Sequence, residues 1–491
     1  MVQINQDSKR FRTAMRFFTY GVMTMAVIAL STLVILLSLG YRFDKSLNIV
    51  REGLVQLGDR PVDAKYSING KEYSGTTPAK ATLPAGDYSI VLHQSGYRSW
   101  QKNISVIAGR VHWINYARLI PEQLSPETVK GFGKVVFAQA SPDKRWIIAD
   151  VSAESKNQLE LIDLKDPQKP EFMPFTVPES ELTKKDNILG TISFVEWSLD
   201  SKYMLLKHTN GDTIEYLRVE RAKVANTVNI SKRFQLSLTD VHLSGGDAGI
   251  VFARTGGALR RIDLAGNTVS GALLDNVRSY EVFGDSTIAY ARTAADSDDK
   301  QILQVGLLVK DKNTVLNELP VGNDVAVAYK EYDHHSYFVI ANRSTSQLKV
   351  LQDPLQDSSQ GQQVFIEFDN LKPTTVQFNP TGRFLMVRDG VNIGMYDFYE
   401  QQKHTFSVDG LSSQAQLKWL DEFRIAAVQN GQLAMWDFDG TNKQTLVTHT
   451  ALNAVGPLLD EDDDVLYTFT QPDAQKDAFQ FQSTSLKLKT K

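Results

Sequence analysis

Cysteine is absent from this 491-residue chain, and its absence excludes several kinds of chemistry. There can be no disulfide, no thiolate nucleophile and no zinc site built on sulfur. The compartment stays open, because envelope and cytosolic proteins alike can lack cysteine. Long clusters of Lys and Arg are also missing, and the formal net charge is −4. We therefore expect no nucleic-acid partner.

The local motifs of common enzyme classes are missing too. The sequence has no His-Glu-x-x-His, no Gly-x-Ser-x-Gly, no Walker-type loop and no Gly-x-Gly-x-x-Gly. We accordingly assign no catalytic residue, no cofactor and no metal ligand. Disorder is not indicated either, since 42% hydrophobic and 22% charged residues are typical of globular domains.

One long apolar run, from Phe17 to Gly40, contains no charged residue. As a helix its ~24 residues would span about 36 Å, enough to cross a hydrocarbon core of about 30 Å. A cleavable signal peptide has a shorter apolar stretch and a small-residue cleavage site, and a buried core helix is rarely apolar all round. We therefore predict a transmembrane helix over residues 17–40.

Basic residues on the two sides of this run indicate its orientation. Lys9, Arg10, Arg12 and Arg16 precede the run, and Arg42, Lys45 and Arg51 follow it. This modest bias predicts a cytoplasmic tail over residues 1–16 and a C-terminal mass outside the cytoplasm. We expect a single-pass protein of the cell membrane.

After a linker at residues 41–52, residues 53–121 alternate short strand-like segments with turn signals. Strands are expected at Leu54–Leu57, Ala64–Ile68, Tyr88–Leu92, Gln101–Ile107 and Val111–Leu119. Asn69-Gly70 supplies the strongest two-residue hairpin signal. The pattern predicts a compact antiparallel β unit.

This segment resembles the PEGA domain, a β-sandwich-like module of prokaryotic surface proteins. The resemblance rests on four motifs: Ala64-Lys65-Tyr66-Ser67-Ile68-Asn69-Gly70-Lys71, Gly75-Thr76-Thr77-Pro78, Leu83-Pro84-Ala85-Gly86-Asp87-Tyr88 and Gly96-Tyr97-Arg98-Ser99-Trp100. Pro84-Ala85-Gly86-Asp87 stands where the family's naming tetrapeptide begins Pro-Glu-Gly, which leaves the turn chemistry intact. The resemblance implies a binding or spacer module and brings no catalytic motif.

Three aromatic residues of this unit are weak candidates for ligand binding. Tyr97, Trp100 and Trp113 would form a platform for a glycan or peptide if all three were exposed. Small β domains, however, need large apolar side chains in their cores, so inward packing is the stronger interpretation.

Residues 122–491 repeat a turn followed by a β-rich run at a spacing of about 40 to 55 residues. The clearest turns are Ser141-Pro142-Asp143-Lys144-Arg145, Ser198-Leu199-Asp200-Ser201-Lys202 and Asn379-Pro380-Thr381-Gly382-Arg383. Weaker copies begin near Gly245, Gly284, Tyr332, Leu420 and Asp460. A second signal, an Asp between two large apolar residues, recurs at Asp163, Asp263, Asp397 and Asp437.

Such repeats predict a β-propeller of seven or eight four-stranded blades, because a ring covers both faces of every sheet. The segment resembles the WD40-like and TolB-type propeller repeats, whose blades have a Ser-Pro-Asp-Gly-like turn before a strand. An open solenoid or two stacked sandwiches are less favoured alternatives. We expect the ring to close by pairing a strand near Gly133–Ala138 with the last repeat around Phe479–Leu488.

Clustered polar residues suggest metal sites only weakly. His334 and His335 are adjacent, so in a strand they would point to opposite faces, and a solvated turn is favoured. The acidic runs Asp460-Glu461-Asp462-Asp463-Asp464 and Asp296-Ser297-Asp298-Asp299 lack the spacing of a calcium loop. Solvated turns are favoured for both.

The sequence thus predicts an all-β protein with one N-terminal transmembrane helix, a small PEGA-like sandwich and a propeller. The favoured function is a non-enzymatic scaffold or binding protein of the cell envelope, whose propeller engages a protein or a cell-wall glycan. One alternative is a membrane-tethered hydrolase or lyase with its site at the propeller axis. It would require acid, base or metal groups from several blades to converge there with perturbed pKa values. Another alternative is a structural surface-layer protein that self-associates.

Overall fold

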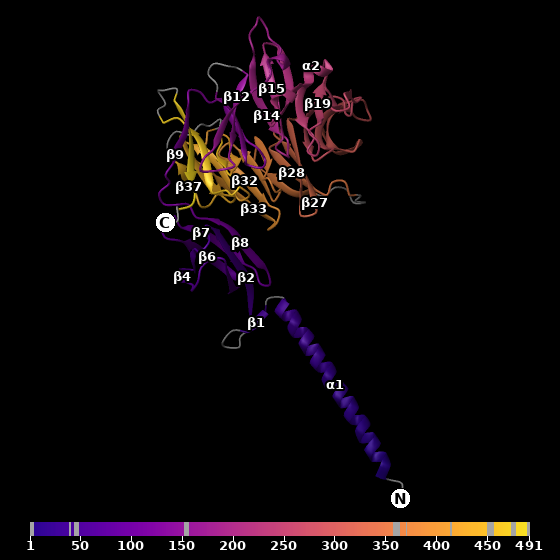
Figure 1. Ribbon diagram of the computed structural model, residues 1–491. Coiled ribbons are helices and arrows are strands. Elements are labelled where there is room, and N and C mark those ends of the chain that lie inside the picture. The colour runs from indigo at the N-terminus through magenta and orange to yellow at the C-terminus, as the bar shows by residue number, and fades with distance from the viewer. Residues whose placement is uncertain are drawn as a thin grey trace. The chain divides into compact units, whose positions relative to one another are not determined.

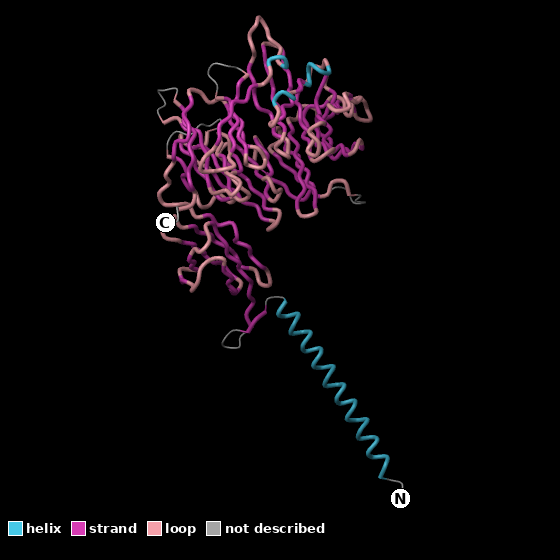
Figure 2. The backbone as a smooth tube through the Cα atoms, viewed as in Figure 1, coloured by secondary structure: helices cyan, strands magenta, loops and turns pink. Residues whose placement is uncertain are grey.

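The computed structural model describes residues 4–38, 41–43, 49–151, 157–356, 364–369, 371–412, 415–448, 456–472 and 478–488. Strands dominate, apart from one long helix and a few short helical pieces (Figure 2). The chain divides into two compact units. The N-terminal unit comprises Met1–Gln123 with Lys487–Lys491, and the C-terminal unit comprises Leu124–Leu486.

Helix α1 (Ile4–Ser38) contains the predicted span (Figure 1). Its segment Met15–Ser38 has 24 residues and a mean hydropathy of 2.3, and none of it is buried, so by length and composition it can cross a membrane. The hydroxyl of Thr19 donates to the Met15 carbonyl at 2.8 Å, which satisfies a polar group inside the helix. Leu39 and Gly40, at the end of the predicted span, lie outside the described residues.

Two four-stranded sheets form the rest of the N-terminal unit. One sheet contains β1 (Tyr41–Phe43), β2 (Ile49–Arg60), β5 (Ala79–Pro84) and β8 (Val111–Arg118), and the other β4 (Lys71–Glu72), β3 (Lys65–Ile68), β6 (Gly86–His93) and β7 (Trp100–Val106). Strand β2 pairs with β8 in parallel, so the predicted antiparallel unit contains one parallel pair. This pair joins segments distant in the sequence, so no local turn signal encodes its direction.

The quoted motifs have structural roles in this unit. Asn69 and Gly70 form a two-residue hairpin turn with φ values of 49° and 76°, and they join β3 to β4 as predicted. Thr77 is buried, and its hydroxyl lies within hydrogen-bond distance of the Asp59 carboxylate and of the Ala64 amide. The Gly75–Pro78 motif therefore ties the loop to the end of β2.

Within the described residues, the C-terminal unit contains eight four-stranded sheets, seven of them built from consecutive strands. The first four sheets are β10 (Phe137–Ala140), β11 (Trp146–Asp150), β12 (Gln158–Asp163), β13 (Glu171–Thr176); β14 (Thr191–Trp197), β15 (Tyr203–Asn210), β16 (Thr213–Glu220), β17 (Val228–Asn229); β18 (Thr239–Leu243), β19 (Ile250–Thr255), β20 (Ala258–Asp263), β21 (Thr268–Val269); and β22 (Val277–Phe283), β23 (Thr287–Ala295), β24 (Gln301–Val309), β25 (Lys312–Pro320). The next three are β26 (Val325–Tyr332), β27 (His335–Asn342), β28 (Gln347–Gln352), β29 (Val364–Asp369); β30 (Thr375–Phe378), β31 (Phe384–Asp389), β32 (Asn392–Asp397), β33 (Gln402–Ser407); and β34 (Lys418–Trp419), β35 (Arg424–Gln429), β36 (Gln432–Asp437), β37 (Gln444–Val447). The eighth is β38 (Leu458–Leu459), β39 (Val465–Thr470), β40 (Phe479–Ser485) and β9 (Glu127–Phe132). Helix α2 (Ile230–Phe234) and the 3-10 turns Glu179–Glu181 and Val224–Asn226 are the remaining helical elements described in this unit.

The sheets close into a ring through β9, which pairs antiparallel with β40. Our choice of Gly133–Ala138 as the closing strand was wrong, because β10 pairs with β11 instead. The four residues between β9 and β10 carry the chain from the outer edge of the eighth sheet to the inner edge of the first. Closure therefore has to use the segment upstream of Gly133, and the predicted propeller is confirmed.

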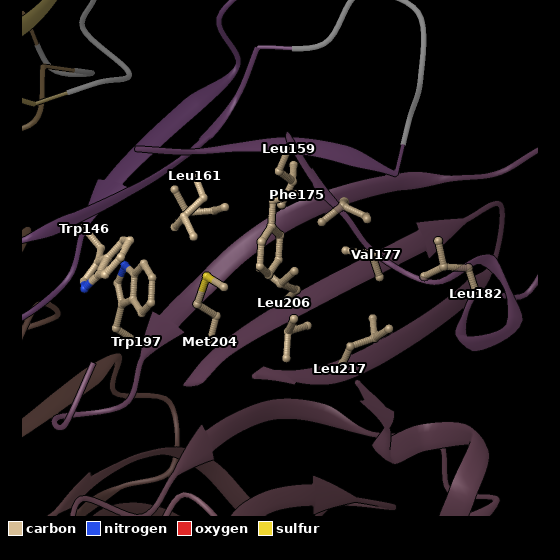
Figure 3. Packing of buried hydrophobic residues seen from close by; sticks show 13 residues of the cluster. Trp146, Leu159, Leu161, Phe175, Val177, Leu182, Trp197, Met204, Leu206 and Leu217 are labelled. Carbon is tan, nitrogen blue, oxygen red and sulfur yellow. The ribbon is translucent and has the colours of Figure 1, made fainter. Parts of the chain in front are cut away.

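Apolar side chains interlock between neighbouring sheets. Figure 3 shows the cluster between the first two sheets, in which Trp146 and Phe175 from the first face Met204 and Leu217 from the second. A similar cluster joins the eighth sheet to the first and includes Phe481, which is fully buried. Each sheet thus obtains its core from its neighbours, as the repeat pattern implied.

All eight predicted turns lie between the first and second strands of the eight sheets. In four of these turns a buried residue opens the turn and accepts a hydrogen bond from the amide five residues later, as Ser141 does from Trp146 at 2.9 Å and Asn379 from Phe384 at 3.0 Å. Asp460 does the same for Val465 at 2.8 Å, so the first member of the acidic run is buried in the turn. The prediction that the whole run is solvated was wrong at this residue.

The second repeated signal is physically linked to the turns. Arg145 in the first turn donates to Asp163 through Nε and Nη2 at 3.1 and 3.0 Å, and Asp163 ends the third strand of the same sheet. Arg383 and Asp397 repeat this bidentate pair in the sixth sheet at 3.0 and 2.7 Å. The turn Arg and the strand-end Asp therefore brace the same edge of a sheet.

Candidate functional site

The first strand of each sheet lies nearest the ring axis. First strands of neighbouring sheets contact one another, as β18 does β22 and β22 does β26, whereas the opposite edge of the eighth sheet is the closing strand β9. In a ring the inner edges converge, so these first strands surround the axis. Side chains from different sheets can meet there.

Strand register identifies one residue of each first strand at the same level. This residue pairs with the third residue of the second strand in the same sheet, for example Glu196 with Leu205 and Gln377 with Met386. We call the set the axial layer; in sheet order it is Gln139, Glu196, His242, Glu281, Lys330, Gln377, Lys418 and Leu458. Its charges are segregated, with acids and histidine in sheets two to four and lysines in sheets five and seven.

His242 is held between two carboxylates. Its Nδ1 lies 3.1 Å from Glu196 Oε2 of the neighbouring sheet, and its Nε2 lies 3.3 Å from Asp240 Oδ1. Both ring nitrogens must donate in this arrangement, so the ring is an imidazolium. Burial opposes the charge, but the hydrogen bonds to Asp240 and Glu196 outweigh it and raise the pKa of His242 to about 10.

Other polar groups surround this triad. Arg254 Nε approaches Asp240 Oδ2 at 3.6 Å, and the Leu243 amide donates to Glu196. Tyr280 packs edge-on against the His242 ring, with a centroid distance of 5.2 Å. Glu196, His242 and Asp240, which we call the triad, therefore already have partners within the protein. Both ring nitrogens of His242 carry a proton, so neither can accept one.

Glu281 differs from the triad because no hydrogen bond or ion pair is found for it within the described part of the chain. Its side chain is solvent-exposed, yet burial, opposed by His242 and reinforced by Asp240, raises its pKa to about 7. A carboxylate on an open surface would not be desolvated in this way. The Glu281 carboxylate is thus accessible to solvent but has enough protein around it to disfavour its ionised form.

Glu196 of the second sheet therefore meets His242 and Asp240 of the third, and the pKa values of His242 and of Glu281 in the fourth sheet are raised. Glu281 is the one member whose carboxylate is available near neutral pH for proton transfer. No group of three or more His, Asp or Glu able to hold a metal is found among the described residues.

The three aromatic candidates of the N-terminal unit differ in their exposure to solvent. Tyr97 and Trp100 are buried, and the Trp100 ring packs edge-on against Tyr116 at 5.9 Å. The Tyr97 hydroxyl accepts a hydrogen bond from the Leu488 amide at 2.9 Å. Trp113 is 40% exposed and is the member of the three that a ligand can reach. The structure does not bring the three onto one exposed face.

The two histidines lie where β26 turns into β27. His334 is in the turn, and His335 Nδ1 lies 2.6 Å from Asp353 Oδ2. Glu331 and the two histidines are among the residues that line a polar pocket of ≈ 600 Å³. In the other acidic run, Asp296 accepts hydrogen bonds from two backbone amides of its own turn.

Sequence reasoning missed the axial layer, although a signal for it exists. In most copies its residue stands two positions before the one that opens the turn, as Glu196 before Ser198 and Gln377 before Asn379. A polar residue in an otherwise apolar strand, repeated with the period of the turns, would have marked these positions.

Comparisons with known proteins complete these observations. Residues 53–120 match the PEGA domain family. Among solved structures the chain is similar to Hsv2 of Kluyveromyces lactis, with 11% identity, a TM-score of 0.39 and coverage of 65% of this chain and 98% of that one. It is also similar to the β-propeller domain of Cps50 (Swd1) from Myceliophteria thermophila (10%, 0.39, 73% and 99%) and to dipeptidyl peptidase 4 of Porphyromonas gingivalis (10%, 0.44, 70% and 56%). No curated protein matches the chain. These neighbours do not decide between a binding protein and an enzyme.

Proposed function

We propose that this chain is a membrane-anchored binding or scaffold protein of the cell envelope, whose propeller lies outside the cytoplasm and engages a protein or a cell-wall glycan. The observation that carries the proposal is the apolar segment Met15–Ser38, which is unburied and precedes two folded β units. A propeller presents a broad, loop-built surface on a rigid scaffold, which suits binding. The PEGA module between anchor and propeller serves as a spacer.

Membrane fractionation and proximity labelling on intact cells test this proposal together. The chain should stay in the membrane pellet after carbonate washing, and protease added outside should digest residues beyond the anchor where no outer barrier protects them. Release by carbonate, with a mature N-terminus beyond residue 38, would favour a cleaved signal peptide instead. Crosslinked neighbours should be envelope proteins or glycans; a cytoplasmic set would contradict the orientation.

A hydrolase or lyase is the second candidate, and Glu281 is the observation that favours it. Its pKa of about 7 is suited to general acid or base catalysis near neutral pH. An activity lost in Glu281→Gln, with unchanged folding, would support this candidate. For a surface-layer role, light scattering should detect self-association of the purified protein.

A further inference from the structure

The lysine side of the axial layer contains three donors in adjacent sheets for which the described part of the chain offers no acceptor. Lys330, Gln377 and Lys418 occupy register-equivalent positions in sheets five, six and seven. All three are half-buried. Over the described ranges, no hydrogen bond or ion pair is found for these side chains. We call this group the lysine arc.

Glycines of the neighbouring sheets make room for both lysine stems. A Cβ added to Gly382 would lie 2.9 Å from Lys330 Cγ, and one added to Gly456 would lie 2.6 Å from Lys418 Cδ and 3.2 Å from its Nζ. Each lysine therefore runs close along the backbone of the following sheet. The close contacts restrict the directions in which the two ammonium groups can point.

The arrangement is costly for folding alone. Burial lowers the pKa of Lys330 and of Lys418, and among the residues that the structure describes no carboxylate opposes the effect for either. A desolvated ammonium without a partner destabilises a fold, whereas a bound anion would compensate both charges. In the triad, by contrast, each charge of Glu196, Asp240 and His242 already has its partner.

We propose that the lysine arc binds an anionic oxygen group of the ligand, either a carboxylate or a phosphate. The ammonium groups of Lys330 and Lys418 supply charge and donors from two sheets, and the Gln377 amide adds neutral donors from the sheet between them. This inference deepens the proposed binding function and places its ligand at the axis.

Competitive acetylation of the full-length chain in detergent, read by mass spectrometry, tests the proposal at single lysines. Probes are inorganic phosphate and citrate, with sodium chloride at matched ionic strength as the screening control. When a probe is at about twice its dissociation constant, acetylation of Lys330 and Lys418 should slow about threefold, because about one third of the sites remain free. Lys300, whose side chain is 75% exposed, serves as the reference and should be unaffected.

Variants distinguish specific binding of the anion at the lysine arc from non-specific attraction of anions to positive charge. Lys330→Gln should remove the protection of Lys418, and Gly456→Ala should weaken it by displacing the Lys418 stem without changing any charge. Lys300→Gln is the matched control and should leave both lysines protected. Protection by phosphate alone or by citrate alone identifies the anion.

If neither anion protects the arc beyond Lys300, or if Gly456→Ala leaves protection intact, the proposal fails. This result is independent of membrane fractionation. A chain released by carbonate could still show protection, and an anchored chain could show none, so the two proposals fail separately.

Discussion

The two bidentate pairs provide a test of how burial sets the strength of an ion pair. Arg383–Asp397 and Arg145–Asp163 have the same geometry in different sheets. The side chains of the first pair are 11% and 1% exposed, and those of the second 41% and 12%. Only the first pair is removed from water, so replacing its arginine leaves a buried, uncompensated carboxylate.

Substitution by methionine keeps the aliphatic stem and removes the charge. Arg383→Met should lower the free energy of unfolding by about 3 to 5 kcal/mol, the cost of breaking a buried pair. Arg145→Met should cost about 1 kcal/mol or less, because the arginine is largely solvated. Adding Asp397→Asn to Arg383→Met should recover part of the loss, since asparagine is neutral and still accepts from the Tyr399 and Glu400 amides.

Urea denaturation followed by circular dichroism measures these effects. The chain has two compact units, so the comparison uses the transition assigned to the propeller. Equal losses for the two arginine variants would refute the reasoning, as would a double variant no more stable than Arg383→Met. In either case the uncompensated charge of Asp397 would not be the cause of the lost free energy of unfolding.

Removal of Ser483–Lys491 cuts the end of β40 and should lower the melting temperature of the whole ring; unchanged melting would count against closure through β40. Thr77→Val leaves the buried Asp59 without its hydroxyl donor and should cost about 1 to 3 kcal/mol in the transition of the N-terminal unit alone, measured by urea denaturation. The folded pKa of His242, about 10, exceeds its usual 6.5, so its stabilisation is complete below pH 6.5 and is lost as the pH rises through 10. His242→Gln should accordingly destabilise the chain at pH 6 and much less above pH 10. The pKa of Glu281 is likewise raised, from 4.5 to about 7, so the folded state loses stability as the pH rises across that window. Because the ionised carboxylate is the destabilised form, Glu281→Gln should stabilise the chain above pH 7 with no effect below 4.5. Urea midpoints of the native chain and of each variant, measured at several pH values, test both predictions. A difference between variant and native chain that does not change with pH would contradict the pKa assigned to that residue.

Features encoded by local chemistry could be predicted from the sequence. The apolar run of α1, the hairpin at Asn69-Gly70 and the eight turns each depend on residues within a few positions of one another. Ser141 and Asn379, for example, cap an amide only five residues later. Such capping recurs in four of the eight copies, so its residue types repeat visibly there.

Features that depend on the pairing of distant strands could not be read in this way. The Arg383–Asp397 pair joins two signals recognised separately, but only sheet register places them together. The parallel partner of β2 and the exact closing strand are likewise non-local choices. The axial layer leaves a periodic signal, a polar residue two positions before most of the turns, but only the registers of all eight sheets place its members at one level.

Comparison within the axial layer indicates why its charges need a functional explanation. Leu458 occupies the equivalent position in the eighth sheet and is buried, so the ring accepts an apolar residue at this level. Lys330 and Lys418 instead place desolvated charges there without internal partners among the described residues, and Glu281 ionises only as the pH rises through about 7. Stability alone would favour residues like leucine at these positions, because each unpaired charge is opposed by burial. A ligand carrying the complementary charges would reverse that balance. Adding phosphate should therefore raise the stability of the native chain. It should leave the stability unchanged when both lysines are replaced by glutamine.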